Sequence, residues 1–168
     1  MNTLVALVVM AAFTGQHAQA SEPGEKAPFT GDWSMIYSCE NATGVYAARC
    51  QQGIRDGFYL YKLTQEGRAL CGYHLATGQM GNRIDDGYLS GEGPSIHGII
   101  QGKTAEVEFR SGRTGEVGRA ILTRDGDTLI WHVTRHIKTA EENWIPSDAV
   151  LQRAESKSPQ HIRGCSRD

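Results

Sequence analysis

Hydrophobic and polar residues alternate with a period of two along most of the chain from residue 31 onward. For example, Ala105, Val107 and Phe109 alternate with Glu106 and Glu108. Because successive side chains of a β-strand point to opposite faces, this alternation predicts half-buried strands. We predict eight or nine short strands, at residues 33–39, 57–63, 69–75, 88–90, 95–101, 105–110, 119–124, 128–135 and 149–153.

Short polar segments that contain glycine separate these runs. Gly102-Lys103 is typical of a tight turn, and Asp125-Gly126 is the strongest hairpin signal in the chain. No convincing amphipathic helix lies between the runs, which argues against βαβ units. A short helix of one or two turns at 139–144 is left as an alternative. The predicted fold class is all-β, an antiparallel meander that closes as a barrel or folds as a sandwich.

The first predicted strand opens with Gly31-Asp32-Trp33, a G-x-W sequence. This start resembles that of the lipocalin and avidin (calycin) superfamily of β-barrels. The resemblance implies a closed barrel, and it implies a carrier or sensor that holds a small apolar ligand in the barrel interior.

The N-terminus carries the pattern of an export signal. An uncharged apolar run at 4–13 is followed by Ala18-Gln19-Ala20, an A-x-A cleavage sequence. The run has about half of the ~20 residues that a membrane-spanning helix needs. We therefore expect a signal peptide (1–20), a linker (21–30), a β-barrel domain (31–154) and a C-terminal tail (155–168), in a periplasmic or secreted protein that is not inserted in the membrane.

The four cysteines all follow the predicted signal peptide, and an even count in an exported chain favours disulfides. Three pairings are possible. We favour Cys39–Cys50, which closes a short loop, and Cys71–Cys165, which ties the tail to the barrel. A four-cysteine zinc site is disfavoured because the chain has no C-x-x-C sequence.

The charge balance limits the classes of partner. The formal net charge is −2, which argues against nucleic acid and against an anionic membrane surface as partners.

His132 and His136 are the most obvious candidate metal ligands, because a helix would bring residues four apart together. Their neighbours are rich in β-branched residues, so we predict a strand, which separates them by roughly 13 Å. They cannot then share one ion, and we predict no metal and no cofactor. A cross-strand pairing with His74 or His97 is the alternative.

Asp85 and Asp86 are the next candidates, since paired carboxylates can act as acid and base or hold a cation. On a strand they would point to opposite faces, and Asp before Gly87 is typical of a turn. We interpret them as turn carboxylates, with a catalytic or calcium-binding role as the alternative. No G-x-S-x-G or P-loop sequence supports an enzyme.

Aromatic side chains are the remaining candidates for binding. Several could converge inside a barrel, where they would form either the core or the wall of a ligand cavity. The candidate ligand-binding residues are Trp33, Tyr59, Tyr61, Tyr73 and Trp131.

These observations favour a non-catalytic exported protein that binds a protein partner, as an inhibitor, immunity or envelope-stress factor does. The first alternative is a carrier with an aromatic-lined barrel cavity. The second is a hydrolase that uses Asp85, Asp86 or a histidine.

Overall fold

The computed structural model describes residues 28–91, 93–138, 144–155 and 165. The predicted signal peptide (1–20), most of the linker and most of the tail lie outside these residues, as do 139–143 of the possible helix. The elements are β1 (Gly31–Ile36), α1 (Gly44–Gln51), β2 (Gly57–Glu66), β3 (Ala69–Gly78), β4 (Arg83–Asp86), the 3-10 helix η1 (Gly87–Ser90), β5 (Ile96–Gln101), β6 (Thr104–Arg110), β7 (Val117–Asp125), β8 (Thr128–Arg135) and β9 (Asp148–Ala154).

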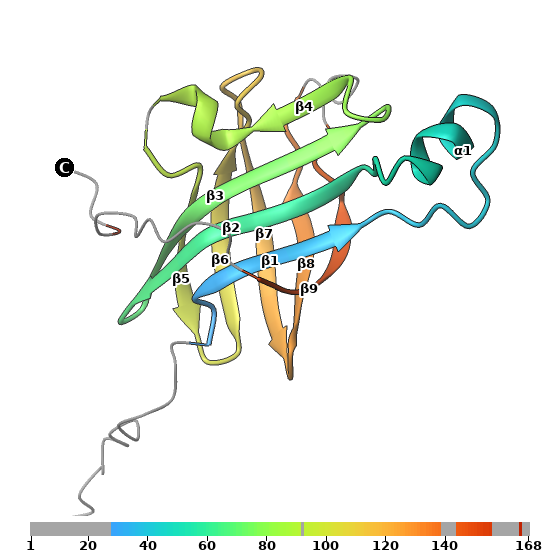
Figure 1. Ribbon diagram of the computed structural model, residues 1–168. Coiled ribbons are helices and arrows are strands. Elements are labelled where there is room, and N and C mark those ends of the chain that lie inside the picture. The colour runs from blue at the N-terminus through green and yellow to red at the C-terminus, as the bar shows by residue number, and fades with distance from the viewer. Residues whose placement is uncertain (1–27, 92, 139–143, 156–164, 166–168) are drawn as a thin grey trace, which may run out of the picture.

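Eight of these strands close an antiparallel barrel, in which β1 pairs with both β2 and β9 (Figure 1). The alternative of a sandwich is thereby removed, and the predicted all-β meander is confirmed. The ninth strand, β4, lies outside the ring of eight. It pairs with the C-terminal half of β3, whereas the N-terminal half of β3 pairs with β5.

Packed side chains fill the inside of the barrel. Trp33 and Trp131 are fully buried there, and the ring of Trp131 lies 5.2 Å from those of Phe58 and Phe109. Most of the buried hydrophobic residues belong to one cluster that reaches all eight strands of the barrel. Phe29, also fully buried, packs into it from the segment that precedes β1. The period-two pattern of the sequence thus becomes a core of inward-facing residues.

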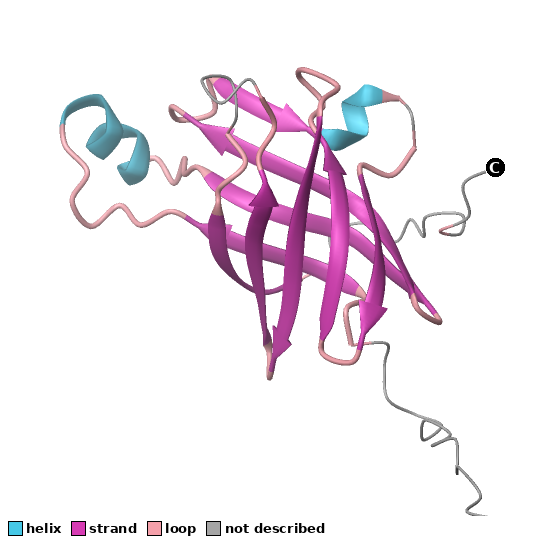
Figure 2. Ribbon diagram, turned by 180° about the vertical axis from the view of Figure 1, so that it is seen from behind, coloured by secondary structure: helices cyan, strands magenta, loops and turns pink. Residues whose placement is uncertain are grey.

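The two ends of the barrel are built differently (Figure 2). At one end, β2–β3, β5–β6 and β7–β8 are joined by tight turns, each with a glycine at positive φ: Gly67, Gly102 and Gly126. At the other end the connections are longer, and residues 37–56 with α1 extend away from the barrel. Loops of this kind carry function more often than tight turns do.

Both predicted disulfides are present. Cys39–Cys50 closes the base of the 37–56 segment, and Cys71–Cys165 links β3 to the tail. The carboxylate of Asp56 also anchors the segment, since it accepts the amides of Met80 and Gly81 at 2.7 and 3.0 Å.

The structure differs from the sequence predictions at several local elements. The first strand ends at Ile36 and not at residue 39, and the helix α1 was not predicted. Residues 88–90 belong to the 3-10 helix η1 and not to a strand, because the carboxylate of Asp86 caps the amide of Tyr88 and turns the chain. No helix within the described residues is long and apolar enough to cross a membrane.

Candidate functional site

The short strand β4 places two neighbouring carboxylates on opposite sides of the sheet. Asp85 pairs with Ala76 of β3 and points inward, whereas Asp86 pairs with Leu75 and points outward. The prediction of opposite faces is confirmed. The interpretation of Asp85 as a turn carboxylate is wrong, because the residue lies in a strand and is fully buried.

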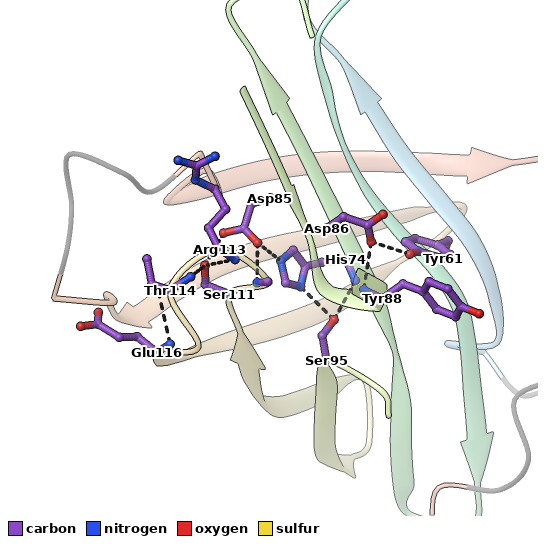
Figure 3. Close-up of polar contacts among 11 residues, drawn as sticks. Tyr61, His74, Asp85, Asp86, Tyr88, Ser95, Ser111, Arg113, Thr114 and Glu116 are labelled. Atoms are coloured by element: carbon purple, nitrogen blue, oxygen red, sulfur yellow. Dashed lines mark hydrogen bonds and ion pairs between the residues drawn. The ribbon is translucent and has the colours of Figure 1, made fainter. Parts of the chain in front are cut away.

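The inward carboxylate belongs to a group of four buried polar side chains, which we call the inner network: His74, Asp85, Ser95 and Ser111 (Figure 3). The hydroxyl of Ser111 donates to Asp85 Oδ2 at 2.5 Å, and the backbone amide of Gly112 donates to Oδ1 at 2.7 Å. His74 Nε2 lies 3.2 Å from the same Oδ1. Asp85 therefore ties β3, β4 and the 111–116 loop together.

The other side of the imidazole is also satisfied. His74 Nδ1 lies 2.9 Å from Ser95 Oγ, which in turn accepts the backbone amide of His74 at 3.1 Å. Both ring nitrogens therefore have a hydrogen-bond partner, the carboxylate of Asp85 at Nε2 and the hydroxyl of Ser95 at Nδ1. Burial raises the pKa of Asp85, but the hydrogen bonds from His74, Ser111 and Gly112 outweigh it and hold the pKa below its usual value.

Two glycines let the chain pass close to this network. A Cβ on Gly87 would overlap the side chain of Ser95 and lie 2.8 Å from His74 Nδ1. A Cβ on Gly112 would overlap the carbonyl group of Asp86. The inner network is therefore covered by tightly fitted backbone.

Serine, histidine and aspartate in contact are also the components of a hydrolytic triad, but this arrangement does not suit one. His74 and Asp85 have no exposed surface, and Ser95 is 3% exposed. A nucleophile must reach its substrate, so these contacts are better explained as structural.

The outward carboxylate organises a different group, which we call the aromatic face: Tyr61, Tyr73, Asp86 and Tyr88. The hydroxyl of Tyr61 donates to Asp86 Oδ1 at 2.9 Å, and the amide of Tyr88 donates to the same oxygen at 2.9 Å. The rings of Tyr61 and Tyr73 stack at 5.6 Å, and Tyr88 packs at 70° to Tyr73 with centroids 5.3 Å apart.

The aromatic face is partly open to solvent. Tyr88 is 55% exposed, and its neighbour Leu89 is 75% exposed. Burial and the hydrogen bond to Asp86 raise the pKa of Tyr61 well above its usual value, and burial, followed by repulsion between the phenolates of Tyr73 and Tyr88, raises the pKa of Tyr73. These phenols therefore stay neutral near pH 7.

The five aromatic residues predicted to bind ligand do not meet in one cavity. Trp33 and Trp131 belong to the core, whereas Tyr59, Tyr61 and Tyr73 lie half-buried on β2 and β3, outside the barrel. Whether any of them binds a ligand stays a prediction. The sequence reasoning missed Asp86 and Tyr88 as members of this group; the Asp-x-Tyr spacing of a capped turn was the available signal.

His132 lies on the strand β8, as predicted, with Nδ1 2.6 Å from Asp148 Oδ1. His136 lies just beyond the strand, and both side chains are exposed. Within the described ranges, no group of three or more His, Cys, Asp or Glu side chains is placed to hold a metal ion.

Two open grooves lie on the outside of the molecule. One of about 720 Å³ runs over β5, β6 and β7 and is lined by Ile99, Glu106 and Ile121 among others. The other, of about 510 Å³, lies beside the 37–56 segment and includes Tyr37 and Tyr46. Neither groove contains a residue of the aromatic face.

Comparisons of the chain with protein-family models, curated proteins and solved structures gave no match. The eight-stranded closed barrel is consistent with the calycin-like resemblance of Gly31-Asp32-Trp33, but no family match supports membership of that superfamily.

Proposed function

We propose that this protein is an exported, non-catalytic binding protein, and that it binds a protein partner through the aromatic face. The observation that carries the proposal is the position of the tyrosines. Tyr61, Tyr73 and Tyr88 contact one another on the outside of the barrel, around a carboxylate that fixes two of them.

Tyrosine suits this role because its ring offers a large rigid surface, while its hydroxyl can form a hydrogen bond. Protein interfaces are enriched in tyrosine, and tyrosines are frequent among the residues that dominate binding energy. The inner network below supports β4, so the face is held in place before the partner arrives. Such preorganisation lowers the entropic cost of binding.

The other two functions fit the described residues less well. A carrier needs space inside the barrel, and the inward side chains there form a packed cluster. A hydrolase needs an accessible nucleophile or acid–base pair, and His74 and Asp85 are fully buried. The two disulfides fit an oxidising, extracytoplasmic compartment, which supports export.

The test is site-specific photo-crosslinking in an extracytoplasmic extract of the source cells. A photoreactive amino acid replaces Leu89 beside the aromatic face or, as the control, Val150, which is 53% exposed on β9. We expect one protein to be captured from position 89 but not from position 150, and to be lost when Tyr73→Ala is added. Equal capture at both positions, or none at position 89, would contradict the proposal.

A further inference from the structure

An internal cation already lies against the aromatic face. Lys62 Nζ is 5.5 Å from the centre of the Tyr88 ring. A bulge in β2 makes this contact possible, because the β2–β3 register shifts between Tyr61 and Thr64, and Lys62 has a positive φ of 52°. The amide of Lys62 donates to Asp32 Oδ1 at 2.6 Å, which holds the bulge.

The bulge has a direct effect on the outer surface. Leu60 and Leu63 are both buried, so the two residues between them, Tyr61 and Lys62, lie together on the outside. A regular strand would turn one of them inward. The bulge therefore inserts one extra residue into β2, and this residue places a tyrosine and a cation side by side.

The remaining groups of the face are also suited to a cation. Among the described residues, the groups that donate to Asp86 are a phenol and a backbone amide, and neither carries a charge. The ring of Tyr61 reaches this carboxylate through its hydroxyl, and the rings of Tyr73 and Tyr88 continue the aromatic face, of which Tyr88 is 55% exposed. The faces of such rings attract positive charge. Carboxylate and aromatic ring together match a guanidinium, which is planar, weakly hydrated and able to stack and to form paired hydrogen bonds.

We propose that the aromatic face recognises an arginine side chain of the partner protein, with Asp86 accepting its N–H groups and the tyrosine rings stacking on it. This rests on the proposed function and names the chemistry of the partner's contact. Lys62 acts as an internal competitor, because its ammonium occupies the ring of Tyr88 and repels a second cation. Binding of the guanidinium displaces it.

The test uses small probes on the whole protein, so it does not depend on finding the partner. The probe is Nα-acetyl-arginine amide, and its control is Nα-acetyl-citrulline amide, which has nearly the same shape without the charge. Ring resonances of Tyr61, Tyr73 and Tyr88 are followed by NMR during titration. We expect millimolar binding of the arginine probe and roughly tenfold weaker binding of the citrulline probe.

Two substitutions at the aromatic face are expected to change the affinity for the arginine probe in opposite directions. Asp86→Asn keeps the acceptor for Tyr88 but removes the charge, and we expect about fivefold weaker binding of the arginine probe. Lys62→Gln removes the competitor, and we expect binding to become about two- to threefold tighter. Asp148→Asn, an exposed acid on β9, is the matched control and should leave binding unchanged. Thermal melts confirm that each variant is folded.

Equal shifts from the arginine and citrulline probes, shifts outside the tyrosine rings, or unchanged binding in Asp86→Asn would overturn the proposal. Weaker binding in Lys62→Gln would also overturn it, since it would make Lys62 part of the recognition. A lysine probe that binds more tightly than the arginine probe would overturn the choice of guanidinium. If the arginine probe binds as expected while crosslinking captures no partner, the proposed function fails and the cation site remains.

Discussion

Asp85 and Asp86 are neighbours in sequence, yet they serve two different regions of the molecule. The inward carboxylate is fully buried and satisfied by His74, Ser111 and the backbone, whereas the outward one lies at a partly exposed group of tyrosines. One strand of four residues thus joins an architectural site to a candidate binding site. Burial and hydrogen-bond partners decide between the two roles, because both residues are aspartates of the same short strand.

The largest effect on stability is expected at Asp85. In Asp85→Ala the hydrogen-bonding groups of His74, Ser111 and Gly112 lose their buried acceptor, which should lower the free energy of unfolding by about 3 kcal/mol. The melting temperature should fall by on the order of 10 °C. Urea unfolding and thermal melts measure both; a loss comparable to that of Asp86→Ala would contradict the architectural role.

The next effect concerns binding and appears on the outer face. Tyr73 contacts both Tyr61 and Tyr88, so Tyr73→Ala removes the centre of the aromatic face. We expect affinity for the crosslinked partner to fall more than tenfold, because central aromatic residues dominate such interfaces. Stability should fall by only about 1 kcal/mol, since the side chain is half-exposed. Calorimetric titration checks the affinity, and Ile99→Ala on β5 is the control.

Acid should lower the stability of the folded protein through the inner network. The pKa of Asp85 is held below its usual value in the folded protein, so the unfolded chain takes up its proton first as the pH falls. The stability that Asp85 contributes is fully present above the ordinary carboxyl range and is lost as the pH falls through the lowered pKa. Asp85→Asn should therefore show a shallower loss of stability below about pH 4 than the wild type does. Parallel unfolding curves against pH for the two proteins would argue against this.

The smallest effect on stability is expected for Asp86→Asn. The amide oxygen can still accept from Tyr61 and cap Tyr88, and Asn is as good a cap as Asp. We expect a change within about 0.5 kcal/mol, together with the weaker arginine binding described above. A loss as large as that of Asp85→Ala would mean that the two carboxylates do not differ in role.

The sequence predicted the barrel better than the site. Period-two alternation depends only on which residues face inward, so residues such as Val107 and Trp131 were correctly expected on strands. The even count of cysteines behind a predicted export signal favoured disulfides but left three pairings open, and the favoured bridge Cys71–Cys165 is present.

The inner network and the aromatic face could not be predicted in the same way. His74 meets Asp85 only because β4 folds back on β3, and Ser95 and Ser111 arrive from later segments of the chain. Alternation placed Trp131 on an inward side without deciding between core and cavity wall, and it did not show that Tyr73 lies on the outside of the barrel. The bulge at Lys62, which places two successive residues outside, breaks the very pattern on which the predictions relied.

The most direct test of the central claim, that recognition takes place on the outside of β2, β3 and β4, is hydrogen–deuterium exchange of the protein with and without its captured partner. We expect added protection of backbone amides at 57–66, 69–78 and 83–91, with little change in β6, β7 and β8. Protection confined to β6, β7 and β8, or to the 37–56 segment, would contradict this location of the binding surface.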